Sequence, residues 1–188
     1  MKQLAVLEQK LPAFWKQAAA GPLTLALLVL VGLFGIGGTK LAVYRQQVVS
    51  SFSAGEKSMA GDLNERVGAA ANVVTVAQQL QNLDGQLLEQ ARQAVQAFEQ
   101  AQGPAALYKA DQQLEAAIET LYQQAKAQAQ QKQAELLSEQ YMEFKSRGTI
   151  LRNGEYNRTA QAFNQTLNQF PANLLGEVWG LDQAEYFA

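Results

Sequence analysis

The chain has 188 residues and a formal net charge of −2, and 17% of its residues are charged. It contains no His and no Cys, which removes thiol chemistry, the usual zinc and haem ligands and the commonest general base, so we expect no metal and no cofactor. A net charge of −2 provides no positive potential that would attract phosphates, so we expect no nucleic-acid partner. Ala, Gln and Leu are abundant and no stretch alternates like a strand, which predicts an all-α chain.

An uncharged run covers residues 17–39, behind a short tail over residues 1–16. As a helix it would span roughly 34 Å, and a bilayer core is roughly 30 Å thick. Trp15 and Tyr44 lie near its two ends, where amphipathic rings favour the membrane interface. The run predicts a retained single-pass transmembrane anchor. A cleaved signal peptide and a buried core helix are the alternatives.

The basic residues on the two sides of this run nearly balance. Three lysines precede it, and Lys40, Arg45 and Lys57 follow it. The positive-inside rule therefore tilts only slightly towards a cytoplasmic N-terminus, with the following domain outside the cytoplasm. Gly32, Gly35 and Gly38 recur every three residues and could admit a second helix, although membrane helices often simply tolerate glycine.

The next segment, residues 40–61, is predicted to be a helical stalk with a break within residues 50–58. Asp62 is the predicted N-cap of the helical domain, residues 62–188. The first apolar seam of this domain consists of Leu63, Val67, Ala70, Val74, Ala77, Leu88, Ala91, Val95 and Phe98. Its interruption around Asp84 predicts a kinked or split helix.

Gly103 and Pro104 are predicted to end this seam, because Pro cannot continue a helix but suits the first turn of the next one. The second seam consists of Leu107, Leu114, Ile118, Leu121 and Ala125. It leads into a Gln-rich stretch, residues 123–135, which we expect to be an exposed helix because Ala, Gln and Lys are good helix formers; disorder is the alternative. Such seams must bury against one another, which predicts an antiparallel bundle of three or four long helices with coiled-coil-like packing.

The end of the chain carries the most regular pattern. Tyr156, Phe163 and Phe170 fall seven residues apart, which is the spacing of a helical seam, and Pro171 is predicted to end that helix. The short tail beyond it contains Leu174, Leu175, Val178, Trp179, Leu181, Tyr186 and Phe187. So apolar a tail is expected to fold back onto the bundle or to dock on a neighbouring subunit.

This ending resembles the closing signature of the LemA family, which has two aromatic-Asn pairs seven residues apart, then Phe-Pro, then a tail ending in Tyr-Phe. The corresponding positions are Tyr156-Asn157, Phe163-Asn164, Phe170-Pro171 and Tyr186-Phe187. Arg66 and Asn72 keep a six-residue spacing that the family shows after its anchor. The Gln-rich stretch departs from the family, which has a Tyr-Pro turn there. The resemblance implies an anchored helical bundle of the bacterial envelope without an assigned reaction.

Four polar residues are candidates for structural or interaction roles. Arg66 and Asn72 are interpreted as a polar network that holds two helices in register, with a partner contact as the alternative. Asn157 and Asn164 are expected to bond to backbone where two helices cross. The candidate interaction residues in full are Arg66, Asn72, Tyr156, Asn157, Phe163, Asn164, Phe170, Pro171, Trp179, Tyr186 and Phe187.

The carboxylates are expected to form a solvated face. They include Asp62, Glu65, Asp84, Asp111, Glu115, Glu119, Glu135, Glu139 and Glu143. A di-metal site in a bundle would need Glu-x-x-His partners, and the chain has no His. A Gly-rich phosphate loop and a serine with a base partner are also missing from the sequence, so we expect no enzymatic activity.

Two functions fit these patterns. The first is a non-enzymatic structural or scaffolding protein, anchored in the lipid bilayer of the bacterial inner membrane, whose bundle serves self-association as a homo-oligomer or the binding of a membrane protein partner. The alternative is an adaptor subunit that regulates a membrane enzyme such as an envelope protease, which the family resemblance suggests. The Gln-rich stretch and the tail around Trp179 would then be its docking surfaces.

Overall fold

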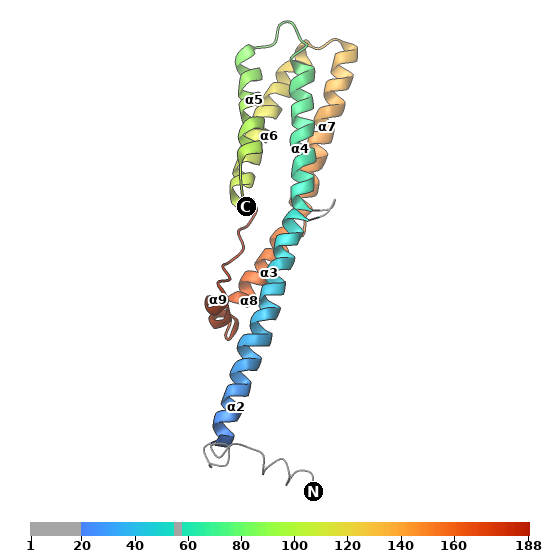
Figure 1. The fold of residues 1–188 in the computed structure, drawn as a ribbon. Coiled ribbons are helices and arrows are strands. Elements are labelled where there is room, and N and C mark those ends of the chain that lie inside the picture. The colour runs from blue at the N-terminus through green and yellow to red at the C-terminus, as the bar shows by residue number, and fades with distance from the viewer. Residues whose placement is uncertain (1–19, 55–57) are drawn as a thin grey trace. The chain divides into compact units, whose positions relative to one another are not determined.

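A computed structural model describes residues 20–54 and 58–188, and every element within these ranges is a helix. This confirms the predicted all-α class. The predicted N-terminal tail and Trp15 lie outside the described residues. The helices labelled in Figure 1 divide between two compact units. The bundle unit contains residues 45–166 and 183–188, and the apolar-helix unit contains residues up to 44 and residues 167–182.

Four long helices of the described chain build the bundle unit and lie side by side in Figure 1. They are α4 (Met59–Ala77), α5 (Gly85–Gln100), α6 (Pro104–Gln128) and α7 (Gln131–Asn153). Short connections join consecutive helices that are in contact, so neighbours in the chain run antiparallel. Helix α4 also packs along α7 and α6. The structure therefore confirms the predicted antiparallel bundle.

The core of the bundle unit contains residues of the two predicted seams and further apolar residues outside them. Its fully buried large apolar side chains include Leu63, Val73, Leu114, Ile118, Leu121, Leu137 and Phe144. Burying one such side chain contributes about 1.5–3 kcal/mol, and no helix can bury its seam without the others. Packing of the four helices against one another is thus the main stabilising term of this unit.

Helix α4 begins earlier than the sequence suggests. Ser58 is its N-cap, with the side-chain oxygen accepting a hydrogen bond from the backbone N–H of Gly61 at 3.2 Å. The prediction that Asp62 caps this helix is wrong. Asp62 lies in the first turn instead, where its negative charge favours the positive end of the helix dipole.

The predicted interruption of the first seam is a complete split between α4 and α5. Asp84 is the N-cap of α5, and its Oδ1 accepts a hydrogen bond from the backbone N–H of Gln86 at 2.8 Å. The predicted boundary before α6 is confirmed as well. Gly103 has a φ of 82°, a conformation that favours glycine, and Pro104 opens the helix.

The prediction of one exposed helix across residues 123–135 is wrong. Ala129 and Gln130 separate α6 from α7 and have extended ψ angles of 136° and 161°. Leu137, beyond this break, is fully buried. The chain must reverse direction for Leu137 to reach the core. Tertiary packing therefore outweighs the uniform helix propensity of residues 123–135.

The apolar-helix unit begins with a continuous helix made of α2 (Ala20–Val31), the π-helical η2 (Gly32–Gly37) and α3 (Gly38–Ser53), which continues into the bundle unit. Within the described ranges, one helix, Gly21–Ser53, is long and apolar enough to cross a membrane. Its exposed large side chains are Leu23, Leu25, Leu27, Leu28, Val29, Leu30, Val31, Ile36, Val43 and Val49. This exposure argues against the buried core helix.

The aromatic seam at the end of the chain is shorter than predicted. Helix α8 (Tyr156–Leu167) buries Tyr156 and Phe163, but it ends before Phe170, whose side chain is 78% exposed. The prediction that Phe170 extends the buried seam and that Pro171 ends its helix is therefore wrong. Pro171 is instead the N-cap residue of a separate helix, α9 (Ala172–Trp179), in the apolar-helix unit.

Candidate functional site

A buried arginine ties three helices of the bundle together. The Arg66 side chain on α4 is fully buried. Its Nε donates to Asp111 Oδ1 on α6 at 2.5 Å, and its Nη2 donates to Glu115 Oε2 at 2.9 Å. Its Nη1 donates to the backbone oxygen of Phe144 on α7 at 2.8 Å, and the guanidinium carbon lies 4.0 Å from the Phe144 ring centroid. All three guanidinium nitrogens thus have partners, as a buried charge requires.

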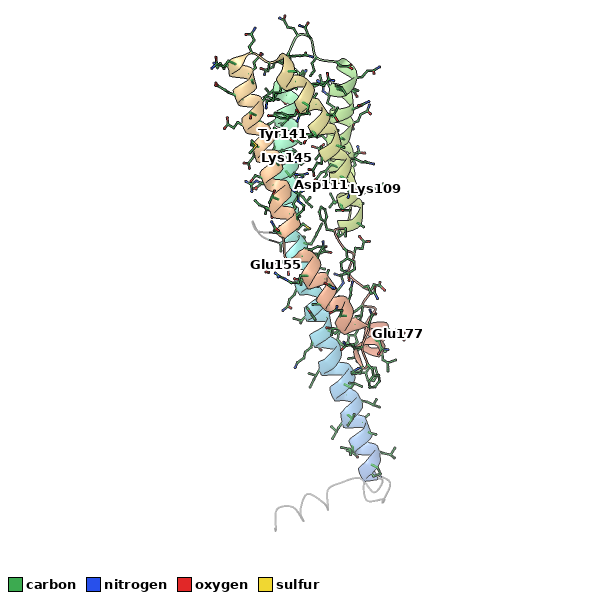
Figure 2. The ribbon with its side chains drawn as sticks, turned by 180° about the vertical axis from the view of Figure 1, so that it is seen from behind. Lys109, Asp111, Tyr141, Lys145, Glu155 and Glu177 are labelled. Atoms are coloured by element: carbon green, nitrogen blue, oxygen red, sulfur yellow. The ribbon has the colours of Figure 1, made fainter. Side chains whose placement is uncertain are left out.

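The acidic side of this network continues towards the surface through Lys145 on α7, which donates to Glu115 Oε1 at 2.6 Å. Figure 2 labels Asp111 on α6 and Lys145 on the adjacent α7. Burial raises the pKa of the Asp111 carboxyl, and the neighbouring Arg66 cation offsets only part of that rise. Burial would also raise the pKa of Glu115, but the hydrogen bond from Lys145 and the charge of Arg66 lower it overall.

A second polar contact between α6 and α7 lies beside the ionic network. The Tyr141 hydroxyl donates to the Glu119 carboxylate, and the Tyr141 ring stacks on Tyr122 with centroids 3.7 Å apart. Burial and the bond to Glu119 raise the pKa of the Tyr141 phenol. The phenol therefore stays protonated as a donor, and the contact supports packing of the two helices.

Gly148 on α7 makes room for the arginine. A Cβ at this position would lie 2.0 Å from Arg66 Nη1. Helix α7 continues through Gly148 to Asn153. The glycine is needed for the close approach of the guanidinium and not for a turn.

The acidic partners of Arg66 were not predicted from the sequence. The expected solvated face is wrong for Asp111, which is buried, whereas Glu115 is half-buried and partly exposed. Asp111 follows Leu107 by four residues and precedes Leu114 by three, so it falls on the apolar seam of α6. A carboxylate on a seam needs a buried partner, and this spacing is the signal that could have identified it.

Asn72 does not join the Arg66 network. It is exposed, and its Nδ2 donates to Gln140 Oε1 at 3.0 Å, which links α4 to α7 at the surface. Arg66 and Asn72 thus both connect α4 with α7, but through separate contacts. The contacts of the buried Arg66 contribute more to the free energy of unfolding, because exposed polar pairs contribute little.

The two asparagines of α8 bind the last residues of the chain. Asn164 pairs with both backbone groups of Ala184, accepting from its N–H at 2.7 Å and donating to its carbonyl at 2.9 Å. Asn157 pairs in the same way with Phe187, at 2.8 and 2.7 Å. The Tyr156 hydroxyl donates to the carbonyl of Glu185 at 2.7 Å. We call this arrangement the C-terminal clamp.

The clamp supplies hydrogen-bond partners to the backbone of a segment that has no regular secondary structure. Residues 183–188 form neither helix nor strand, so their backbone groups need side-chain partners, and an amide side chain offers one donor and one acceptor. Phe187 is buried, with its ring edge-on to Tyr108 at a centroid distance of 5.2 Å, whereas Tyr186 is 39% exposed. The predicted backbone partners of the asparagines are therefore in the chain end and not at a helix crossing.

Substituting Asn164 by Ala is expected to destabilise the bundle unit by about 1–3 kcal/mol, because the buried N–H and C=O of Ala184 lose their partner. The midpoint of urea unfolding, followed by circular dichroism, measures this loss. Asn72→Ala, which removes only an exposed bond to Gln140 on the surface of the same unit, is the matched control and should change the midpoint much less. Equal effects of both substitutions would contradict the clamp.

Trp179 is placed in the apolar-helix unit. Its indole Nε1 donates to the backbone oxygen of Phe34 in η2 at 3.0 Å. A Cβ on Gly38 would lie 1.9 Å from the same nitrogen, and one on Gly37 would lie 3.0 Å from Leu175 Cδ1. The adjacent glycines therefore allow α9 to approach the apolar helix closely.

The described residues define an all-helical protein with two parts. One is a four-helix bundle that is tied by a buried ionic network and holds its own chain end, and the other contains a long apolar helix. The sequence model of the LemA family matches residues 56–188, and the chain belongs to the LemA family. The matched range contains every candidate interaction residue named from the sequence. No curated protein and no solved structure matches the chain.

Proposed function

We propose that this protein is a non-enzymatic scaffold of the bacterial inner membrane, anchored by its apolar helix, whose bundle serves self-association or the binding of a membrane protein partner. The exposure of the apolar helix carries this proposal. Leu23, Leu27 and Val31 are between 58% and 61% exposed, and their neighbours are similar. A continuous apolar surface of this kind is unfavourable in water and suits the hydrocarbon of a bilayer.

The contact of α9 with the apolar helix favours a retained anchor over a cleaved signal peptide. Trp179 and Leu175 pack on Phe34, Gly37 and Gly38. Cleavage after the apolar run would remove the partner of the indole N–H and expose Leu175, which is now buried. A segment near the end of the chain is thus adapted to the presence of the apolar helix.

The bundle interior supports a scaffolding role. Its buried charges engage one another: Arg66 uses all three guanidinium nitrogens on Asp111, Glu115 and the Phe144 carbonyl. Such a network positions α4, α6 and α7, and the full burial of Arg66 keeps its guanidinium away from solvent. The small positive-inside bias favours, by a slight margin, a bundle on the non-cytoplasmic side.

We expect the full chain to stay in membranes that are washed with alkaline carbonate, because removing the apolar helix from lipid would expose its leucines and valines to water. Residues 39–188 alone should be released into the supernatant and should give a helical circular dichroism spectrum. Release of the full chain would contradict the anchor. A β-rich spectrum of the released part would contradict the fold.

The adaptor of a membrane enzyme, such as an envelope protease, is the alternative function. Protein purified from native membranes in mild detergent separates the two possibilities. Copies of this chain alone favour the scaffold, whereas an enzyme present in a fixed ratio favours the adaptor.

A further inference from the structure

We propose that α9 and the residue pair before it form a second lipid-contacting element, which lies at the border of the bilayer beside the apolar helix. This proposal rests on the proposed membrane anchor. It assigns to α9 a lipid surface as its partner, in place of the bundle or a neighbouring subunit, while residues 183–188 stay in the C-terminal clamp.

The outward side of α9 carries exposed apolar side chains beside the polar Asn173 and Glu177, although its inward side is already buried. Leu175 and Gly176 are buried, while Leu174 and Val178, one helical turn apart, are 43% and 65% exposed. Phe170, which precedes α9, is 78% exposed. Helix α9 contains a single charged residue, Glu177, which is labelled in Figure 2. A helix that is apolar on more than its packed face suits a lipid environment better than water.

The contact with the apolar helix sets the position of α9 along the membrane normal. The glycines that Trp179 and Leu175 approach, Gly37 and Gly38, are at the end of the uncharged run, and Lys40 is the first charge after it. A charged residue marks the edge of the hydrocarbon, and tryptophan is enriched at that depth. α9 therefore lies at the lipid–water interface if the run spans the bilayer.

Two polar groups in this unit are paired as lipid requires. The Trp179 indole N–H donates to the carbonyl of Phe34, which lies within the π-helical η2. The Thr39 hydroxyl donates to the carbonyl of Gly35 in the same stretch. In a membrane such donors cannot rely on water, so these internal partners fit immersion in lipid.

The natural absence of Cys allows a direct test on the full chain in phospholipid vesicles. Single substitutions Val178→Cys, Leu27→Cys and Met142→Cys carry a nitroxide label, and collision with oxygen, which concentrates in lipid, is compared with collision with a water-soluble nickel chelate. Leu27 reports the apolar helix, and Met142, 62% exposed on α7, reports the water-facing bundle.

The proposal predicts that the label at 178 collides more with oxygen than with the nickel chelate, as at position 27, and that the ratio is reversed at position 142. A label at 178 that behaves like the one at 142 would overturn it. Protection of 178 from both probes would also overturn it, because a second protein copy and not lipid would then cover α9. Water exposure of position 27 would refute the anchor itself, which separates the failure of the two proposals.

Discussion

Replacement of Arg66 by Met is expected to destabilise the bundle unit by about 3–5 kcal/mol, which is the cost of breaking a buried ion pair and leaving the other charges behind. Asp111 would stay buried without its 2.5 Å partner, and the carbonyl of Phe144 would lose its donor. The free energy of urea unfolding in mild detergent, followed by circular dichroism, measures the loss. An unchanged unfolding curve would show that the network does not stabilise the bundle.

A surface arginine provides the matched control for this experiment. Arg92 on α5 is exposed, and its nearest paired carboxylate is Glu89 at 3.9 Å. Arg92→Met should leave the unfolding curve nearly unchanged. The combined variant Arg66→Met, Asp111→Leu and Glu115→Leu should recover much of the stability lost in Arg66→Met, because no buried charge remains unpaired. If the combined variant is less stable than Arg66→Met, buried charge is not the cause of the loss.

Phe163→Ala is expected to cost about 3–5 kcal/mol, the usual effect of truncating a fully buried aromatic side chain. Phe163 lies in the middle of α8 and is not exposed at all. Phe170→Ala is the matched control from the same seven-residue pattern, and its effect on the unfolding midpoint should be small because the side chain is 78% exposed. A larger effect at Phe170 than at Phe163 would contradict the division of the pattern between a buried helix and an exposed turn.

The helices were predicted well wherever the apolar seam and the residues that mark a helix boundary indicate the same helix. Leu114, Ile118 and Leu121 follow helical periodicity and are fully buried. Asp84 and Pro104 mark helix starts through capping chemistry that depends only on nearby residues. Local physics determines such features, so no tertiary information was needed.

Two of the errors arose where a feature depends on residues far away in the chain. Ala129 and Gln130 form a turn inside a stretch of uniform helix propensity, and only the burial of Leu137 beyond it explains the reversal. Phe170 continues a seven-residue repeat past the end of its helix. In both cases the pattern of side chains was read correctly, but the backbone left the helix for reasons of packing.

The candidate site was only partly predictable for the same reason. Arg66 could be identified as a polar residue between helices, but its acidic partners lie 45 and 49 residues further along the chain, on α6. The partners of Asn157 and Asn164 are backbone atoms, which leave no side-chain signature in the sequence. Pairings of this kind follow from the register of the folded helices.

The mass of the intact protein in mild detergent, determined by light scattering with the detergent contribution subtracted, tests the scaffolding role most directly. The scaffold predicts one discrete species whose protein mass is a whole multiple, greater than one, of 20.5 kDa. A protein that remains a monomer at every concentration would contradict self-association and would favour the adaptor of a membrane enzyme.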